Sequence, residues 1–332
     1  MYDTLYLWIP VDLISDPIII PQLRLSLTNA RETISVSQKT IESSGSHDNL
    51  FIRIRDTGVF ICGSLCKYYF GNNQETLTLT TAHQALKKLA DTTGLPIFKA
   101  SVYRIDIAEN YIMQQPAWDY VDSLGSTTYY NRLEQDNGVY YRNKRRQLLF
   151  YDKVAEQKKE KQPLLDIFEG QNVLRYEIQF KKKIPEQTGV SEVTVSHLVD
   201  PFYYKQLLHR YLAEYQSINK VQKVLLELKN IKDGKDFLTQ LLRAGAAHYG
   251  GEEALLRQID ELRDKPYFDC AVNRSRLKKK IKGTFNRDLS MDFGDPIGEL
   301  GEKIALKVSS EIVLLGLDNM EVPGLDLNEP VI

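Results

Sequence analysis

Three short segments of this 332-residue chain alternate apolar and polar side chains, and this pattern constrains its fold more than any other feature. They are Val102–Ala108, Gln147–Lys153 and Leu174–Lys181. Successive side chains of a β-strand point to opposite faces, so each segment would have one face suited to a core and one polar face. If the three strands lie in one sheet, their polar faces form a single patch.

That patch would gather acidic, basic and phenolic groups. Its expected members are Arg104, Asp106, Tyr151, Lys153, Arg175 and Glu177. Carboxylate oxygens suit a hard divalent cation, guanidinium groups suit a phosphate, and a phenol can act as a nucleophile. The residues therefore predict a site for a divalent metal, a phosphate and a nucleophile.

The order of the remaining signals predicts an α+β fold. Asp56-Thr57-Gly58 and Asn137-Gly138 are typical of hairpin turns, and Thr80 or Thr81 can cap a helix that ends before Gly94. After residue 194 the spacing becomes helical, with Asp200 as a cap and Pro201 in the first turn.

We therefore predict a mainly antiparallel sheet backed by helices, followed by a smaller, mostly helical domain. The expected division is an α+β domain over 1–190 that carries the polar patch, a mostly helical domain over 195–320, and a loose acidic tail over 321–332.

Charge is distributed unevenly, although the formal net charge is only −1. Residues 140–183 hold twelve Lys or Arg against six Asp or Glu, residues 273–287 hold seven against none, and residues 288–332 hold two against ten. Two basic stretches of this kind are compatible with a nucleic-acid partner.

The three cysteines form no pattern of paired spacings, which favours a reducing compartment. The first residues lack the pattern of a secretory signal, and no apolar run approaches the roughly 18 residues of a membrane span. We expect a cytoplasmic protein that does not act at a membrane.

Four ordered segments resemble the initiators of rolling-circle replication. They are Arg104–Ala108, Gly125–Tyr130, Leu149–Lys153 with Glu156, and Leu174–Ile178. The resemblance is to phage and plasmid replication proteins related to the gene-two protein of filamentous phages and to staphylococcal-type plasmid initiators. It covers most of residues 1–220, more weakly in the first hundred.

The resemblance implies that residues 1–190 form a nicking and joining catalytic domain and that residues 195–320 form a DNA-binding or accessory domain. It also implies a catalytic mechanism. Tyr151 would attack one origin phosphodiester, giving a 5′-phosphotyrosine link and a free 3′-hydroxyl primer, with later joining. Asp106 and Glu177 would bind Mg²⁺ or Mn²⁺, because no histidine pair has His-x-His spacing. Lys153 would favour the phenolate, and Arg104 and Arg175 would clamp phosphate oxygens.

The basic stretches would bind origin DNA, both duplex and single-stranded. The expected contacts are Tyr130, Tyr141, Arg142, Lys144, Arg145 and Arg146 near the nick, and Arg274, Arg276, Lys278 and Lys279 on a helix that reads the duplex. The resemblance also implies a host replicative helicase as a partner, and a homodimer is left open.

Each assignment has a simpler alternative. Tyr151 can be an ordinary packed strand tyrosine, and the acid and arginine pairs can be surface ion pairs. Tyr130, Tyr140 and Tyr141 can be core or hairpin residues, and the run 274–282 can be a solvated helix face.

Two other functions compete with nicking. A non-catalytic origin-binding replication or regulatory protein would keep the sheet without the chemistry. A tyrosine recombinase is disfavoured because the chain has no His-x-x-Arg motif.

Overall fold

The computed structural model describes residues 1–35, 40–221, 231–248, 251–285 and 296–318, which form two compact units. The first unit comprises Met1–Lys220 and Ile297–Ile332, and the second comprises Val221–Pro296. The helical second unit is thus inserted into the chain of the first. The expected tail over 321–332 lies outside the described residues.

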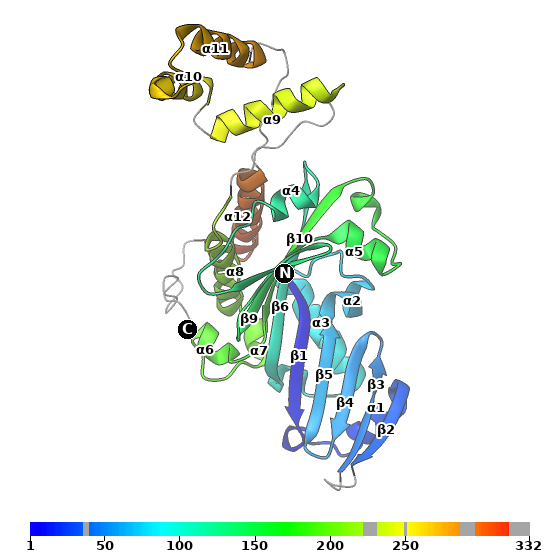
Figure 1. Cartoon of the computed structure of the whole chain (residues 1–332). Helices are drawn as coiled ribbons and strands as arrows, with labels where there is room; N and C mark the ends of the chain where they lie inside the picture. The colour runs from blue at the N-terminus through cyan, green and yellow to red at the C-terminus, as the bar shows by residue number, and fades with distance from the viewer. Residues whose placement is uncertain (36–39, 222–230, 249–250, 286–295, 319–332) are drawn as a thin grey trace. The chain divides into compact units, whose positions relative to one another are not determined.

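The first unit is built on one ten-stranded sheet in which every neighbouring pair is antiparallel. The strand order is β2-β3-β4-β5-β1-β6-β10-β9-β8-β7 (Figure 1). The strands are β1 (Tyr2–Pro10), β2 (Thr28–Ser35), β3 (Thr40–His47), β4 (Leu50–Arg55), β5 (Gly58–Ser64), β6 (Ser101–Met113), β7 (Asn131–Gln135), β8 (Gly138–Arg142), β9 (Arg146–Asp152) and β10 (Asn172–Phe180).

The helices of this unit are α1 (Ile19–Ser26), α2 (Leu65–Phe70), α3 (Leu79–Thr93), α4 (Ala117–Val121), α5 (Lys153–Lys159), α6 (Ile184–Thr188), α7 (Val195–Leu198), α8 (Pro201–Gln216) and α12 (Pro296–Leu314). The cap of α3 is Thr78 rather than Thr80 or Thr81, because Thr78 and Thr81 form a reciprocal capping box. Asp200 caps α8 as expected, accepting a hydrogen bond from the Tyr203 N–H at 2.8 Å.

The three predicted segments form the neighbouring strands β6, β10 and β9, and their apolar faces pack against α8. Ile107, Ile178 and Leu148 are paired across these strands and buried. Rings of Phe150 and Tyr176 stack at 4.3 Å between centroids. Tyr211 of α8 lies against Tyr176 at 4.2 Å, so this face is the core and the opposite face is left for polar groups.

The second unit contains α9 (Gly234–His248), α10 (Gly251–Glu261) and α11 (Ala271–Phe285), and both α9 and α11 contact α10. The predicted antiparallel sheet with helices, followed by a mostly helical region, is therefore confirmed. The division of tasks between 1–190 and 195–320 stays a prediction. No helix among the described residues is both long enough and apolar enough to cross a membrane.

Candidate active site

The polar face of the sheet carries three rows of facing residues, each crossing four strands. In order along β6, β10, β9 and β8, the rows are Asp106, Gln179, Gln147 and Arg142; then Ala108, Glu177, Leu149 and Tyr140; then Asn110, Arg175, Tyr151 and Gly138. Directly paired residues project from the same side of an antiparallel sheet. The expected patch of Asp106, Tyr151, Arg175 and Glu177 therefore exists on one face.

Tyr151 is 8% exposed and lies outside the hydrophobic core. Leu148 and Phe150 of the same strand belong to that core. It borders a pocket of about 410 Å³ that Glu177 and Tyr140 also line. The phenol and one predicted metal ligand thus open into the same space.

Gly138 allows β8 to lie close to Tyr151. A Cβ atom at this position would come within 2.0 Å of the Phe150 carbonyl oxygen and 2.7 Å of the Tyr151 Cα. Since the contacts are with backbone, only glycine fits here without moving the strands apart.

Burial raises the pKa of the Tyr151 phenol well above its ordinary value. The positive charge of Arg175 works in the opposite direction, while Glu177, Glu156 and Asp3 raise the pKa further. An uncharged phenol is therefore the resting form at neutral pH, and Arg175 is the side chain that most favours the phenolate.

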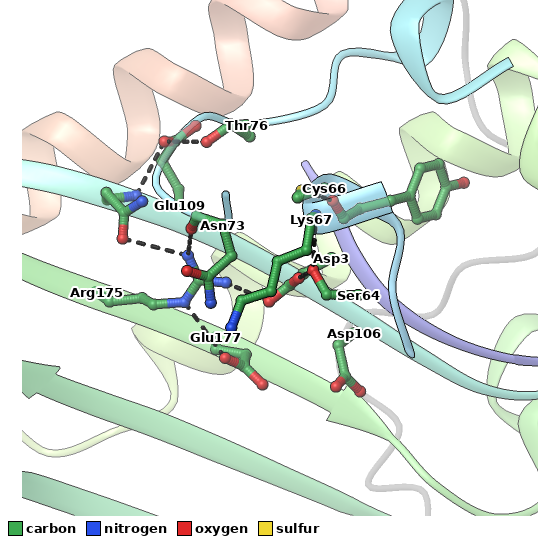
Figure 2. A network of polar contacts seen from close by, with 12 residues as sticks. Asp3, Ser64, Cys66, Lys67, Asn73, Thr76, Asp106, Glu109, Arg175 and Glu177 are labelled. Atoms are coloured by element: carbon green, nitrogen blue, oxygen red, sulfur yellow. Dashed lines mark hydrogen bonds and ion pairs between the residues drawn. The ribbon is translucent and has the colours of Figure 1, made fainter. Parts of the chain in front are cut away.

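Arg175 is buried at the centre of a polar network (Figure 2). Its guanidinium is paired with Asp3, lies 3.4 Å from Glu177, and donates to the Asn73 carbonyl at 3.1 Å and to Asn110 Oδ1 at 3.2 Å. Arg175, which was predicted to clamp phosphate oxygens, therefore contacts protein groups that fix the position of its guanidinium.

Asp106 is held by Arg104, whose Nε and Nη2 donate to its two oxygens at 2.8 and 2.6 Å. Burial raises the pKa of Asp106 well above its ordinary value, and repulsion from Glu177 adds to this although Arg104 opposes it. Glu177 in turn accepts a hydrogen bond from Gln179 Nε2 at 2.6 Å. The carboxyl groups of Asp106 and Glu177 project to the same side of β6 and β10 (Figure 2).

Asp106 and Glu177 suit a divalent cation that also binds substrate. Among the described residues, no three His, Cys, Asp or Glu side chains converge as a complete metal cage. Mg²⁺ is commonly held by one or two carboxylates together with phosphate oxygens and water. Two buried carboxylates that repel each other are compatible with that arrangement, because a cation between them offsets the repulsion.

Lys153 begins α5 rather than extending β9 and is fully buried. Its Nζ donates to Glu156 at 2.8 Å and to Asn73 Oδ1 at 3.1 Å. Burial lowers its pKa, and Arg175 lowers it further. Lys153 therefore lies beside the network, with its charge directed at Glu156.

The basic run before β9 divides into exposed and buried members. Arg142 and Lys144 are exposed, and Arg145 pairs with Glu186 at 3.1 Å. Arg146 is 4% exposed and forms an ion pair with Glu214 of α8. Arg142 lies in the same row as Asp106, whereas Arg146 belongs to the interior.

The tyrosines expected to stack on bases are directed inward. Tyr141 is fully buried and donates to the Gly125 carbonyl at 2.6 Å, and Tyr130 donates to Glu214 at 2.7 Å. Both positions match the alternative of core and hairpin packing. Tyr140, the neighbour of Tyr141 on β8, lines the pocket beside Tyr151.

On α11 of the second unit, Arg276 and Lys279 are exposed. Lys278 pairs with Asp260 of α10 at 2.5 Å, and Arg274 donates to the Asp269 carbonyl at 2.9 Å. Two of the four predicted contacts thus hold the unit together, and two face solvent.

Three of the residues that contact Arg175 were not predicted from the sequence. Asp3 and Asn73 contact Arg175 from β1 and from the loop after α2, and Asn110 extends its row on β6. Asp3 is the only charged residue between Tyr2 and Ile9, and this was a usable signal for it. Asn73 lies in a polar loop and gave none.

Comparison with known proteins identifies the family of this chain. The family model for the N-terminal domain of the replication-associated gene-two protein matches residues 1–199, which is the region that holds the sheet and the network. No curated protein matches the chain. The family match covers more than half of the sequence and confirms the resemblance to gene-two-type initiators. The chain belongs to the family of gene-two-type phage replication-associated proteins.

Proposed function

We propose that this protein initiates rolling-circle replication by nicking one origin strand with Tyr151, in a metal-dependent reaction, and later rejoining it. The observation that carries the proposal is the single polar face of the sheet, on which Tyr151 and Glu177 lie in neighbouring rows beside the row that holds Asp106. The family match supports a role in replication.

In the nicking step, the Tyr151 oxygen bonds to phosphorus as the bond to the 3′ oxygen breaks. The phenol proton passes to water, and the departing 3′ oxygen takes up a proton, so the number of phosphoester bonds is unchanged. Joining is the reverse attack by a 3′-hydroxyl. The ester linkage is conserved throughout, which is why the reaction needs no external energy source.

The side chains must overcome the cost of ionising the phenol. Even at an ordinary pKa of about 10, forming the phenolate at neutral pH costs roughly 4 kcal/mol. Burial increases this cost, and the charge of Arg175 reduces it. Asp106 and Glu177 would hold Mg²⁺ or Mn²⁺, which would supply Lewis-acid polarisation of the phosphate when bound.

The surrounding surface would position the DNA. Arg142 and Lys144 are exposed next to the site and suit the backbone of the unpaired strand. Arg276 and Lys279 of α11 suit the origin duplex. A host helicase is the partner this scheme requires, because the protein only opens the strand at the nick.

The test is incubation with a plasmid carrying the cognate origin and Mg²⁺ or Mn²⁺, followed by denaturing electrophoresis. We expect a single-strand nick with the protein attached to the 5′ end, and no nick in EDTA. Slower migration of intact strands under native conditions, without a nick, would instead support the non-catalytic origin-binding protein.

A further inference from the structure

The pocket beside Tyr151 has walls suited to a base rather than to a phosphate. Its charged lining residues, all within the described part of the chain, are Asp136, Glu156, Glu160 and Glu177 against the single cation Lys159. Lys153 and Arg175 offset the charges of Glu156 and Glu177. The remaining excess of Asp136 and Glu160 over Lys159 would still repel a phosphodiester inside the pocket. A neutral base would not be repelled.

The same pocket offers a ring and hydrogen-bonding amides. Tyr140 and Leu149 form an apolar wall, and Gln135, Asn137 and Gln179 line the remainder. Flipped or unpaired bases are commonly read by stacking on an aromatic or apolar side chain together with polar contacts to the base edge. A volume of about 410 Å³ lies within the range of small-ligand pockets, about 300–1,000 Å³.

The excess of acceptors indicates which bases fit. Carboxylates accept hydrogen bonds from exocyclic amino groups, as Asp and Glu do from cytosine. Thymine has no exocyclic amino group, and its single N3–H donor is flanked by two carbonyl oxygens that carboxylates repel. Asp136 and Glu160 lie at the exposed rim, where they can approach the edge of a base whose ring rests on Tyr140.

We infer that this pocket binds one unpaired nucleobase next to the cleaved phosphate and selects a base that carries an exocyclic amino group, against thymine. The inference rests on the proposed nicking function. Asp136, Glu160 and Tyr140 are its specificity-determining residues, and the phosphate lies outside the pocket, toward Asp106.

The experiment uses the full chain, Mn²⁺ and a pool of randomised single-stranded DNA, with sequencing of the strands that become covalently attached. At one position beside the linkage we expect thymine to be depleted about 10-fold or more relative to the input. The Asp136→Asn/Glu160→Gln double variant should reduce this depletion, because amides can donate to thymine. The control Glu169→Gln, an exposed site outside the pocket, should leave it unchanged.

A second measurement needs no variant. An attached sequence is resynthesised with its selected base lacking the amino group, as purine for adenine, inosine for guanine or pyrimidin-2-one for cytosine. We expect adduct formation to fall about 10-fold. Equal adduct formation, or adducts with all four bases equally frequent at both neighbouring positions, would overturn the inference while leaving nicking intact. No adduct on any DNA would instead contradict the proposed function.

Discussion

At the scale of single residues, Arg175 makes more contacts within the site than Tyr151, the proposed nucleophile, does. One buried guanidinium holds groups from β1, β6, β10 and the loop after α2, and its charge acts on the Tyr151 phenol. A planar fork with five donors is suited to this task, and a lysine is not.

Removing Arg175 should cost both stability and activity. Arg175→Met leaves Asp3 and Glu177 buried without their cation, and breaking a buried pair in this way costs about 3–5 kcal/mol. Lys144 is an exposed neighbour of the site. The free energy of unfolding in urea of Lys144→Met should differ from that of the unmodified protein by less than about 0.5 kcal/mol. Equal effects from the two variants would contradict the central role of Arg175.

The raised pKa of Asp106 would make binding of the proposed cation depend on pH. In the folded state Asp106 keeps its proton at pH values above its ordinary pKa of 3.8. Without a metal, the contribution of Asp106 to the free energy of unfolding therefore decreases as pH rises through its folded pKa. A bound cation must displace the proton, so the rise in Tm on adding Mn²⁺ should grow from pH 5 to pH 8.

Differential scanning fluorimetry measures this effect. At 100 times its Kd a cation stabilises by about 2.7 kcal/mol. Asp106→Asn should abolish the Mn²⁺-dependent shift, and the exposed Asp166→Asn should keep it. A shift that persists in Asp106→Asn would place the cation elsewhere.

At the scale of elements, the connection from β8 to β9 separates residues that the sequence groups together. Arg142 ends β8 on the polar face, whereas Arg146 begins β9 and reaches Glu214 of α8. Arg142, which is exposed, thus lies only four positions from Arg146, which links α8 to the sheet.

These two arginines should respond differently to removal. Arg142→Ala should weaken binding to single-stranded DNA. The magnitude of the slope of log Kobs against log salt should fall by about 0.7, and the free energy of unfolding should change little. Arg146→Ala should lower the free energy of unfolding in urea by about 3–5 kcal/mol, because the buried Glu214 loses its closest cation. Loss of DNA binding in Arg146→Ala, with unchanged binding in Arg142→Ala, would show that the buried pair of Arg146 and Glu214 opens to bind DNA.

At the scale of the whole molecule, a helical unit is inserted between α8 and α12 of the sheet unit. α12 belongs to the sheet unit, where Lys307 pairs with Glu109 at 2.8 Å and Glu311 accepts from Tyr204 at 3.0 Å. The inserted unit has its own basic helix, α11, so the duplex binding proposed for this helix can be tested with substitutions that leave the candidate active site unchanged.

Arg276→Ala/Lys279→Ala tests that separation. Loss of two phosphate contacts should reduce the salt slope of duplex binding by about 1.8 and leave nicking of single-stranded DNA unchanged. The matched control Arg274→Ala/Lys278→Ala removes internal contacts and should lower the stability of the unit instead. An unchanged slope in the first variant would exclude this helix from duplex binding.

Much of this arrangement could be predicted from period-two alternation. Asp106, Tyr151, Arg175 and Glu177 were placed on one face because a strand fixes which side chains share a side. The long-range partners were not predictable, since Asp3 and Asn73 reach Arg175 only through strand order and a loop. Lys153 was assigned to the strand although β9 ends at Asp152, whose side chain caps α5. Burial of Arg146 and Tyr141 depends on packing against α8 and α4, which local sequence does not encode.

The most direct test identifies the residue that carries the DNA. Covalent adducts formed in Mn²⁺ are digested with nuclease and protease, and mass spectrometry locates the nucleotide on a peptide. We expect it on Tyr151, with adducts reduced about 10⁴-fold or more in Tyr151→Phe and retained in Tyr140→Phe, which keeps its ring in the same pocket. A nucleotide on any other residue, or undiminished adduct formation by Tyr151→Phe, would contradict the assignment of Tyr151 as the nucleophile.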